Sequence, residues 1–372
     1  MKKNWEVKKL GEVCEIVNGG TPDTKVPEYW DGEILWITPK DMGKLDSIFV
    51  DDTARKITEA GLKNSSAKKL PINSIILSSR APIGHLAVNI KEISTNQGCK
   101  GIIPKKGLST LFLFYFLKNS VELLNSMGSG TTFKELSGSK LAEVKIPFPS
   151  LPEQQRIVAI LDEAFTAIAT AKENAEKNLQ NAHELFESYL QSVFTNPGDE
   201  WEEKTFDEVC VLQRGFDLPT HSRNIGNFPL VSSNGITDKI DVWKVKAPGV
   251  VTGRSGTIGN IHYIEEDFWP LNTALYIKDF HGNNPRCVYF FLRRFDLRKY
   301  SSGAGVPTLN RNNVHVVKVR FPKSIIEQHV IVAKLDALSA ETKKLEAIYR
   351  QKLNDLDELK KSVLNKAFNG EL

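Results

Sequence analysis

The sequence has few features of an exported, membrane-bound or disulfide-stabilised protein. Its 372 residues include only four cysteines, with no CxxC pair among them. We therefore expect buried, reduced thiols and no disulfide. The longest apolar run, Leu111 to Leu117, is far too short to span a bilayer. The first residues, Met1 to Glu6, contain no apolar stretch of the kind found in signal peptides. These absences predict a cytoplasmic protein.

Motifs of catalysis are also missing. There is no Asn-Pro-Pro-Tyr or Asp-Pro-Pro-Tyr tetrapeptide for amino-methyl transfer, and no GxxxxGK[ST] loop for ATP. The seven histidines show no ligand spacing such as HxxxH, which argues against a structural metal. Asp23 with Glu143 and Lys145 resembles the carboxylate set of a nuclease. However, the corresponding segment later in the chain, His315 to Lys318, lacks the acid. We expect no catalytic site, cofactor or metal in this chain.

Composition and charge are ordinary for a globular protein. Hydrophobic residues make up 41% and charged residues 25% of the chain, and its length suffices for two or three domains. The net charge of +4 is weak evidence for nucleic-acid binding. Charge is informative by patch rather than by sum, because acidic helices can mask more basic globular segments.

A long helix is predicted from 153 to 194. Between Glu153 and Pro197 there is no proline or glycine, and apolar or small residues recur at spacings close to three and four. This spacing is typical of a coiled-coil seam. At about 1.5 Å per residue the helix would be about 60 Å long. The seam positions are Ile157, Leu161, Ala164, Ile168, Ala171, Ala175, Ala182, Leu185, Tyr189 and Val193.

This helix and the segment before it occur twice in the chain. The run Glu153 to Asp162 matches Glu327 to Asp336, and both copies continue as long segments without proline or glycine. The matches upstream are Trp5–Cys14 with Trp201–Cys210, Ser79–Gly84 with Gly253–Gly259 (one residue inserted), Phe112–Leu117 with Cys287–Leu292, and Lys145–Pro149 with Lys318–Pro322. The order is therefore globule, helix, globule, helix.

The remainder of each copy predicts a mixed globule. Glu33–Thr38 and Ser74–Ser78 have the length and β-branched content of strands, while Leu108–Leu124 has the length of a helix. We expect an α+β protein with two α/β globules of curled, mostly antiparallel strands. The predicted boundaries are 1–152 and 196–326 for the globules, and 153–195 and 327–372 for the helices.

The two long helices are predicted to pack together as an antiparallel coiled coil, which would relate the two halves by a pseudo-two-fold axis. Small residues on the first seam would face bulky residues on the second. A domain-swapped dimer that uses the same seam is the alternative. Asn178 either fixes the register of the seam or lies at its edge. The bulky positions are Leu335, Leu338, Leu345, Ile348, Leu353, Leu356, Leu359 and Val363.

The whole chain resembles the specificity (S) subunits of type I restriction–modification enzymes. The resemblance rests on the duplicated proline-rich run that ends at Glu153-Gln154, with Arg320 replacing the first proline of the second copy. It also rests on the long helices, the Arg80 turn, the tryptophan-led openings and the closing Phe368 to Leu372. The resemblance implies two target-recognition domains, each reading one half of a split DNA site, held apart by helical spacers. It further implies that the spacers dock two methyltransferase subunits, to which restriction/translocase subunits join. S-adenosylmethionine, ATP and Mg would be bound by those partners and not by this chain.

Two groups of residues are candidate DNA contacts. Arg80 and Arg254 lie in matching turns, and a residue shared by modules of different specificity favours a phosphate or structural role over base reading. Thr131 and Thr132 lie in a turn that either offers backbone N–H groups to phosphate or is a plain tight turn. Base-reading side chains are expected in the loops that do not match: Lys25, Tyr29 and Lys40 in the first module, and His221, Arg223, Asn224, Asn234 and Lys239 in the second.

Two alternatives remain open. The same type of subunit could serve a methylation-only or another multi-subunit restriction system. A coiled-coil scaffold with two protein-binding modules is a different class of protein. The scaffold predicts affinity that does not depend on salt, whereas contacts to DNA phosphates make affinity fall steeply as salt rises.

Overall fold

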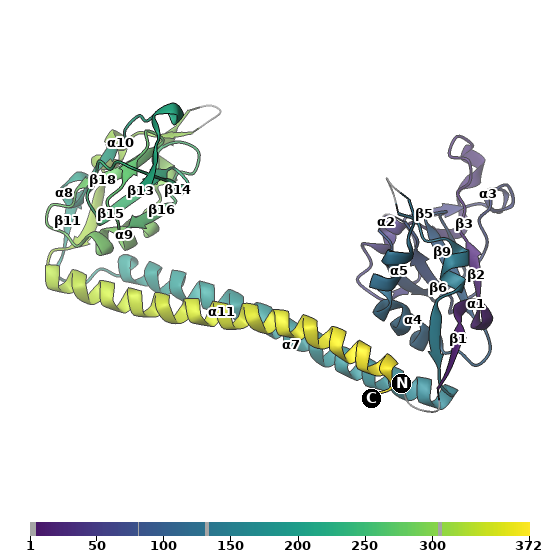
Figure 1. Ribbon diagram of the computed structural model, residues 1–372. Helices are drawn as coiled ribbons and strands as arrows, with labels where there is room; N and C mark the ends of the chain where they lie inside the picture. The colour runs from purple at the N-terminus through teal and green to yellow at the C-terminus, as the bar shows by residue number, and fades with distance from the viewer. Residues whose placement is uncertain (1–4, 81, 131–133, 304–306) are drawn as a thin grey trace. The chain divides into compact units, whose positions relative to one another are not determined.

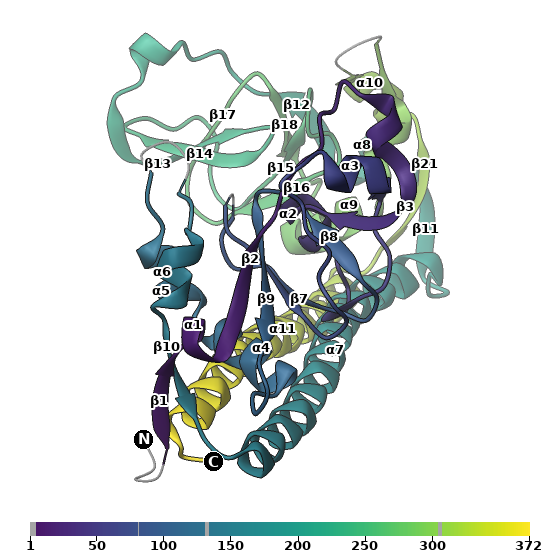
Figure 2. The same cartoon turned by 90° about the vertical axis from the view of Figure 1, so that its right-hand side faces the viewer.

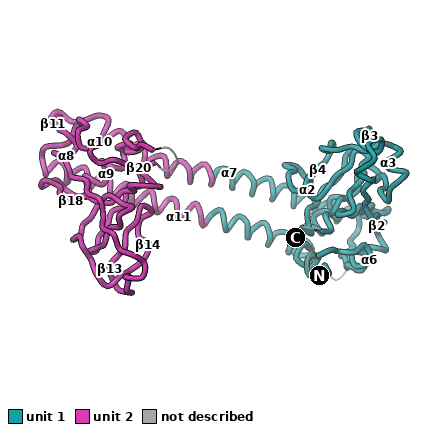
Figure 3. Tube along the Cα trace, turned by 90° about the horizontal axis from the view of Figure 1, so that it is seen from above, with its two compact units in different colours: residues 1–174, 352–372 teal, residues 175–351 magenta. Residues whose placement is uncertain are grey.

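The computed structural model describes residues 5–80, 82–130, 134–303 and 307–372. The chain divides into two compact units, which Figure 3 shows in different colours. Unit 1 comprises Met1–Asn174 and Lys352–Leu372, and unit 2 comprises Ala175–Gln351. Each unit contains one globular module and a part of each of two long helices, α7 (Leu151–Thr195) and α11 (Ile325–Asn369).

The module of unit 1 consists of short strands and helices. Its strands are β1 (Glu6–Lys9), β2 (Cys14–Asn18), β3 (Trp30–Ile37), β4 (Phe49–Val50), β5 (Arg55–Ile57), β6 (Ile75–Ser78), β7 (Leu86–Asn89), β8 (Ile93–Thr95), β9 (Cys99–Pro104) and β10 (Lys145–Phe148). Its helices are α1 (Leu10–Val13), the 3₁₀ turn η1 (Pro27–Tyr29), α2 (Pro39–Met42), α3 (Glu59–Lys63), α4 (Thr110–Asn119), α5 (Val121–Met127) and α6 (Gly138–Ala142).

The core of unit 1 lies on both faces of a five-stranded sheet. The strand order is β2-β9-β6-β7-β4, and a three-stranded sheet β5-β3-β8 packs on the face away from α4. Strand β6 is buried along its whole length, and its first three residues are apolar because both faces of the strand are covered. Ile75 and Leu77 join the cluster around α4, whereas Ile76 joins the cluster between the sheets.

The module of unit 2 repeats this plan. Its strands are β11 (Trp201–Thr205), β12 (Val211–Arg214), β13 (Ile225–Ser232), β14 (Gly235–Ile240), β15 (Gly249–Gly253), β16 (Ile261–Ile264), β17 (Trp269–Pro270), β18 (Ala274–Asp279), β19 (Ser301–Ser302), β20 (Thr308–Leu309) and β21 (Lys318–Pro322). Its helices are α8 (Phe206–Val209), the 3₁₀ turns η2 (Thr220–Ser222) and η3 (Leu297–Tyr300), α9 (Pro285–Arg294) and α10 (Arg311–His315).

The strand orders of the two modules correspond. The order β12-β18-β15-β16 matches β2-β9-β6-β7, β14-β13-β17 matches β5-β3-β8, and β11-β21 matches β1-β10. Most pairs are antiparallel, with parallel pairs such as β3–β8 and β13–β17 at equivalent places. These findings confirm the predicted internal repeat, the α/β modules, and the strands expected at 33–38 and 74–78.

One predicted helix is divided in two. The sequence predicts a single helix from Leu108 to Leu124, but α4 ends at Asn119 and α5 begins at Val121. Ser120 between them has ψ near 6°, and its hydroxyl donates to the carbonyl of Phe116 at 2.8 Å. A serine that bonds to the carbonyl four residues earlier offers the backbone an alternative to the regular helix.

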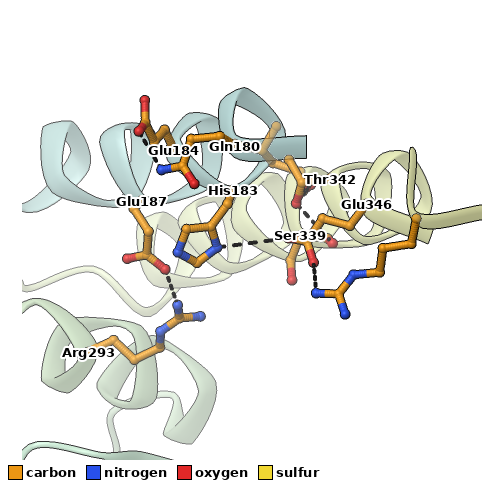
Figure 4. A network of polar contacts seen from close by, with 10 residues as sticks. Gln180, His183, Glu184, Glu187, Arg293, Ser339, Thr342 and Glu346 are labelled. Atoms are coloured by element: carbon orange, nitrogen blue, oxygen red, sulfur yellow. Dashed lines mark hydrogen bonds and ion pairs between the residues drawn. The ribbon is translucent and has the colours of Figure 1, made fainter. Parts of the chain in front are cut away.

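The helices α7 and α11 lie side by side and antiparallel within each unit (Figures 1 and 2). In unit 1, Lys172 near the middle of α7 forms an ion pair of 2.6 Å with Asp357 of α11. At the start of α7, Arg156 donates to the carbonyl of the C-terminal Leu372 at 2.8 Å. In unit 2, His183 approaches Glu346 to 3.9 Å, and Figure 4 shows this contact beside the ion pair of Glu187 with Arg293 of α9. The predicted antiparallel pairing is therefore confirmed.

The predicted seam is wrong at four positions. Leu185 of α7 and Leu345, Ile348 and Leu359 of α11 are exposed by 38–59%. In unit 2 the inward face of α7 passes from Ala182 to Phe186 and Leu190 instead, because these side chains also pack against Phe290 of α9. On α11 the buried Thr342 replaces Leu345. Asn178 is exposed, which places it at the edge of the seam.

The repeated Glu-Gln sequence has a structural explanation. Gln154 is fully buried, accepts the N–H of Ser109 at 2.8 Å, and donates to the carbonyls of Gly107 and Pro149 at 3.0 and 2.9 Å. Gln328 is the equivalent residue in unit 2. It accepts the N–H of Asn284 at 2.7 Å and donates to the side-chain oxygen of Asn283 at 2.8 Å and to the carbonyl of Pro322 at 2.9 Å. Each glutamine thus fixes the start of a long helix to the loop before α4 or α9.

A repeated aspartate forms a second attachment between each long helix and its module. Asp162 of α7 accepts a short hydrogen bond from the hydroxyl of Tyr115 on α4. Asp336 of α11 pairs instead with Arg286 of α9, whose Nε and Nη2 approach one carboxylate oxygen to 2.9 and 2.8 Å. The two units therefore use an equivalent carboxylate with different partners.

All four cysteines are buried free thiols, as expected from the sequence. Burial raises the pKa of Cys14, Cys99 and Cys287 to about 12 in each case, and it also raises the pKa of Cys210. Within the described residues, no helix is both long enough and apolar enough to cross a membrane.

Candidate nucleic-acid interface

Three polar side chains, those of Thr21, Asn96 and Gln97, come together where β2 ends in unit 1, and we call this cluster the polar tip. Gly19 donates to the carbonyl of Cys99 at 3.2 Å, and a Cβ atom on Gly19 would lie only 2.0 Å from the carbonyl oxygen of Asn96. The close approach therefore requires glycine. It brings Thr21 beside the turn that precedes β9. There the Asn96 amide donates to the Thr21 hydroxyl at 2.9 Å, and Thr21 forms a short hydrogen bond with Gln97.

The equivalent tip of unit 2 has different side chains. Gly215 follows β12, and its Cβ would lie 2.2 Å from the carbonyl oxygen of Leu271. Here Asp217 replaces Thr21, and the amide of Asn272 donates a short hydrogen bond to it. A shared backbone framework thus presents a hydroxyl and two amides in one module, and a carboxylate and one amide in the other.

The two predicted arginines do not occupy the same position, although their turns are equivalent. Leu136 donates to the carbonyl of Ser79 at 2.8 Å, and Leu309 donates to the carbonyl of Arg254 at 2.8 Å. Arg254 is therefore equivalent to Ser79, and Arg80 is one residue further along. The inserted residue assumed in the sequence comparison is wrong, because the turns have equal length. Successive residues of extended backbone point to opposite sides, so the two arginines differ in direction.

The other candidates in unit 1 lie at two places. Lys40 is exposed on α2, and the preceding proline and Arg80 both lie close to Gly98, so these candidates lie near the polar tip. Lys25 is exposed in the turn before η1. Tyr29 is partly buried against the cluster of Trp30 and Trp36, and its carbonyl accepts the N–H of Thr58 at 3.0 Å. Thr131 and Thr132 lie outside the described residues.

The candidate DNA-contacting residues of unit 2 differ in whether their side chains already bond to other parts of the protein. His221 is exposed on η2. The guanidinium of Arg223 donates to the carbonyl of Leu218 at 3.0 and 3.2 Å and so holds its own loop. Asn224 donates to Asp241 at 3.0 Å, and Lys239 lies 3.5 Å from Glu266. Asn234 accepts the hydroxyl of Thr257 at 2.7 Å, which places it beside the Arg254 turn.

Sequence reasoning missed the residues of the polar tips. Gln97 and Asn272 come together with Thr21 and Asp217 only through the fold, because they are far apart in the chain. The sequence did contain one indication of the tips. Gly19 and Gly215 follow Cys14 and Cys210 at the same distance in the two copies, which marks a glycine that the shared backbone needs.

Unit 2 contains two partly buried histidines whose pKa is lowered by burial. The Nε2 atom of His315 accepts the N–H of Leu212 at 3.0 Å. Burial lowers the pKa of His315, and nearby Arg311 lowers it further, although Asp207 opposes the shift. Burial also lowers the pKa of His262. Within the described residues, no group of three potential metal-ligating side chains accompanies these histidines.

We expect unit 2 to lose stability as the pH falls from about 7 to about 5. An unfolded histidine gains a proton near pH 6.5, whereas the folded protein resists protonation. The unfolded state therefore binds more protons over this range and is favoured as the pH decreases. Urea unfolding followed by hydrogen exchange of unit 2 peptides measures the effect. His315→Gln, which retains an acceptor for Leu212, should reduce it, and an unchanged pH slope in this variant would contradict the assignment.

The structure thus defines a protein with two equivalent α/β modules, each presenting variable polar loops at one end of its sheet. Comparison with known families identifies it further. The model of the type I restriction modification DNA specificity domain matches twice, over residues 2–180 and 198–355. The chain belongs to this family. Each module thus contains one copy of this DNA specificity domain.

Individual relatives support this assignment. The chain is 37% identical to the MjaIX specificity subunit of Methanocaldococcus jannaschii over 233 residues, 58% of this chain and 54% of the relative. It is 33% identical to the EcoR124I/EcoR124II specificity subunit of Escherichia coli over 202 residues, 52% of this chain and 49% of the relative. The chain thus spans about half the length of these two relatives. It is 26% identical to the Escherichia coli EcoprrI specificity subunit over 92% of this chain and 90% of the relative.

Solved structures share the fold over the full length of the chain. The HsdS subunit from Thermoanaerobacter tengcongensis has a TM-score of 0.69 and 18% identity, covering 100% of this chain and 98% of that chain. A chain from a structure of type I R-M complex assembly and conformational transition has a TM-score of 0.81 and 19% identity, covering 100% and 99%. These similarities confirm the predicted fold.

Proposed function

We propose that each module reads one part of a two-part, asymmetric DNA sequence. The observation that carries this proposal is the pair of polar tips, where an equivalent backbone presents Thr21 and Gln97 in unit 1 but Asp217 and Asn272 in unit 2. Different donors and acceptors on one framework suit the recognition of different base edges. Residues 1–152 and 196–326 are accordingly assigned as target-recognition domains, and 153–195 and 327–372 as spacer helices.

The candidate contacts divide into two roles. The exposed Lys25, Lys40, His221 and Asn234 are assigned to contacts with bases or nearby phosphates. Asn224, just before β13, and Lys239, in β14, are assigned to the same role. Arg254 is assigned to a phosphate of the DNA backbone. Arg80, which lies 3.8 Å from Glu135, remains a candidate for a phosphate contact outside the pocket of unit 1. Arg223 is assigned mainly to holding its own loop, because its guanidinium donates to the carbonyl of Leu218. Tyr29 remains a candidate for a contact with DNA. Thr131 and Thr132 remain candidates for phosphate contacts.

The spacer helices are proposed to dock two methyltransferase subunits, to which restriction subunits bind in turn. Leu345 and Ile348 support this proposal, since they lie one helical turn apart on α11 and are exposed by 38% and 59%. S-adenosylmethionine, ATP and Mg are assigned to these partners. A methylation-only system would use the same surface without the restriction subunits.

Mapping of modified adenines tests the assignment of one module to each half-site. The chain is coexpressed with its methyltransferase partner, and modified adenines are located in the DNA of the cells. We expect them in a two-part sequence with a constant gap. The double variant His221→Ala, Asn234→Ala should relax one part alone, and Lys40→Ala should affect only the other. Removal of one contact to a base is expected to cost about 1–3 kcal/mol.

Two outcomes would contradict the proposed function. A modified sequence that neither set of substitutions changes would remove the modules from sequence recognition. Retention of DNA that does not depend on salt, or no retention at all, would favour the alternative scaffold that binds proteins.

A further inference from the structure

A pocket lies at the same place in both modules. In unit 2 it has a volume of 460 Å³ and lies between the end of β12 and the start of α10. In unit 1 it has a volume of 660 Å³ and lies between the end of β2 and the start of α6. The N-cap residues Asn310 and Ser137 line the two pockets at equivalent positions, each accepting a backbone N–H of the following helix.

The lining of the two pockets differs in charge. Arg214, Arg254 and Arg311 line the pocket of unit 2, and none of the described residues that line it is acidic. At the positions equivalent to Arg214 and Arg311, unit 1 has Asn18 and Gly138.

A carboxylate neutralises the pocket of unit 1. Glu135 lies 3.7 Å from Lys100, whose side chain is only 7% exposed, and 3.8 Å from Arg80. The residue equivalent to Glu135 in unit 2 is Thr308, which cannot provide this charge. The positive charge of the unit 1 pocket is therefore compensated within the protein, whereas among the described arginines that line the unit 2 pocket only Arg214 has a carboxylate partner.

The guanidinium groups in unit 2 are only partly satisfied by the protein. Arg254 donates to the carbonyl of Asn272 at 3.4 Å, and Arg311 donates to the carbonyl of Leu212 at 3.4 Å and to the side chain of Gln213. Neither forms an ion pair with a carboxylate in the described part of the chain. Arg214 has one such partner, Asp217 at 3.2 Å, and is 48% exposed. An oxyanion would offset the mutual repulsion of these three groups and accept their remaining N–H donors.

We propose that this three-arginine pocket binds a phosphate group of the DNA backbone, whereas the equivalent pocket of unit 1 does not. The inference rests on the proposed function for the identity of the ligand, but not for the presence of an anion site. The two modules would then bind the DNA backbone unequally. The pocket of unit 2 would hold a phosphate, whereas the equivalent pocket of unit 1 contains an internal ion pair.

Salt dependence of DNA binding provides the first test. The affinity of the full-length chain, in complex with its methyltransferase partner, is measured for a labelled duplex over a KCl series. The slope of log Kobs against log[KCl] should become shallower by about 0.9 for each phosphate that the variant no longer neutralises. We expect this change for Arg254→Gln combined with Arg311→Gln. Lys318→Gln removes one charge from an exposed site outside the pocket of unit 2 and should leave the slope unchanged.

Two further measurements keep the proposal testable if the arginine variant fails to fold. Glu135→Gln should steepen the slope by about 0.9, because it releases Lys100 and Arg80 from their carboxylate. Inorganic phosphate, added to the full-length chain at constant ionic strength, should raise the unfolding temperature of unit 2 by mass action. Arg311→Gln should abolish this increase.

The outcomes separate the pocket from the proposed function. Stabilisation by phosphate that depends on Arg311, in a chain that binds no DNA, would support the anion site and contradict the DNA assignment. DNA binding with an unchanged slope in the arginine variant, together with no stabilisation by phosphate, would overturn the inference while leaving DNA recognition intact.

Discussion

Replacing Gln154 with methionine is expected to lower the free energy of unfolding of unit 1 by about 3 kcal/mol. Methionine fills a similar volume but makes none of the three hydrogen bonds of the glutamine. The N–H of Ser109 and the carbonyls of Gly107 and Pro149 lose their partner at a buried site, and each such loss costs about 1–3 kcal/mol when water cannot enter. We expect the surrounding groups to shift and recover part of this loss, so the total change in the free energy of unfolding stays near the lower end of the sum.

Urea unfolding monitored by hydrogen exchange of peptides from 105–125 measures this effect. The neighbouring Gln155 is exposed, so Gln155→Met is a control with the same chemical change. Gln328→Met should destabilise unit 2 in the same way, because its side chain makes the equivalent bonds. Equal stabilities for the Gln154 and Gln155 variants would show that the buried amide contributes nothing.

Introducing aspartate at both Leu345 and Ile348 is expected to weaken binding of the proposed methyltransferase partner at least about 30-fold. Central apolar contacts of an interface commonly contribute about 2 kcal/mol or more, and a buried unpaired carboxylate adds a desolvation cost. The folded chain should be little affected, because both side chains are exposed and neither belongs to the apolar cluster around Phe186 of α7.

Copurification of the partner, followed by titration calorimetry, measures the loss. Ile225→Asp is the matched control, since Ile225 is 97% exposed but belongs to β13 of the module rather than to a spacer helix. Comparable binding by wild type and the double variant would place the docking surface elsewhere.

The repeat made much of the fold predictable. The two Glu-Gln runs located the beginnings of α7 and α11, and the apolar runs at 33–38 and 74–78 located β3 and β6. These signals are local: a strand covered on both faces needs a continuous apolar sequence, and a long helix needs an uninterrupted run of helix-compatible residues. The partners of Gln154 and Gln328 were not predictable, because they are backbone groups and one side chain, that of Asn283, which the fold brings close.

The incorrect predictions in the helices arise where a contact from elsewhere in the fold overrides the local apolar pattern. Leu185, Leu345 and Ile348 satisfy the spacing of a helix seam, but Phe186 turns the inward face of α7 toward α9. Ser120 breaks a segment whose apolar pattern continues through it. The spacing of apolar residues in one helix does not show that a second helix packs on a different face of it. Nor does it show that a side-chain hydroxyl will bond to the backbone and end the helix.

The candidate site was less predictable than the fold. The loops that carry Lys40, His221 and Asn234 were recognised because they differ between the copies. In contrast, Gln97 and Asn272 became candidates only when their distances to Thr21 and Asp217 were known. The pairing of Arg80 with Arg254 failed by one residue, since a short motif does not fix the register that backbone hydrogen bonds determine.

Burial of all four thiols gives the protein a practical property. Alkylating reagents attack the thiolate, and each native cysteine is both covered and held in its neutral form by a raised pKa. A maleimide dye at neutral pH should therefore leave the natural chain unlabelled. One cysteine introduced on the surface of each unit would then carry a donor and an acceptor fluorophore without any native thiol being removed, so that energy transfer can follow the separation of the two modules as DNA is bound.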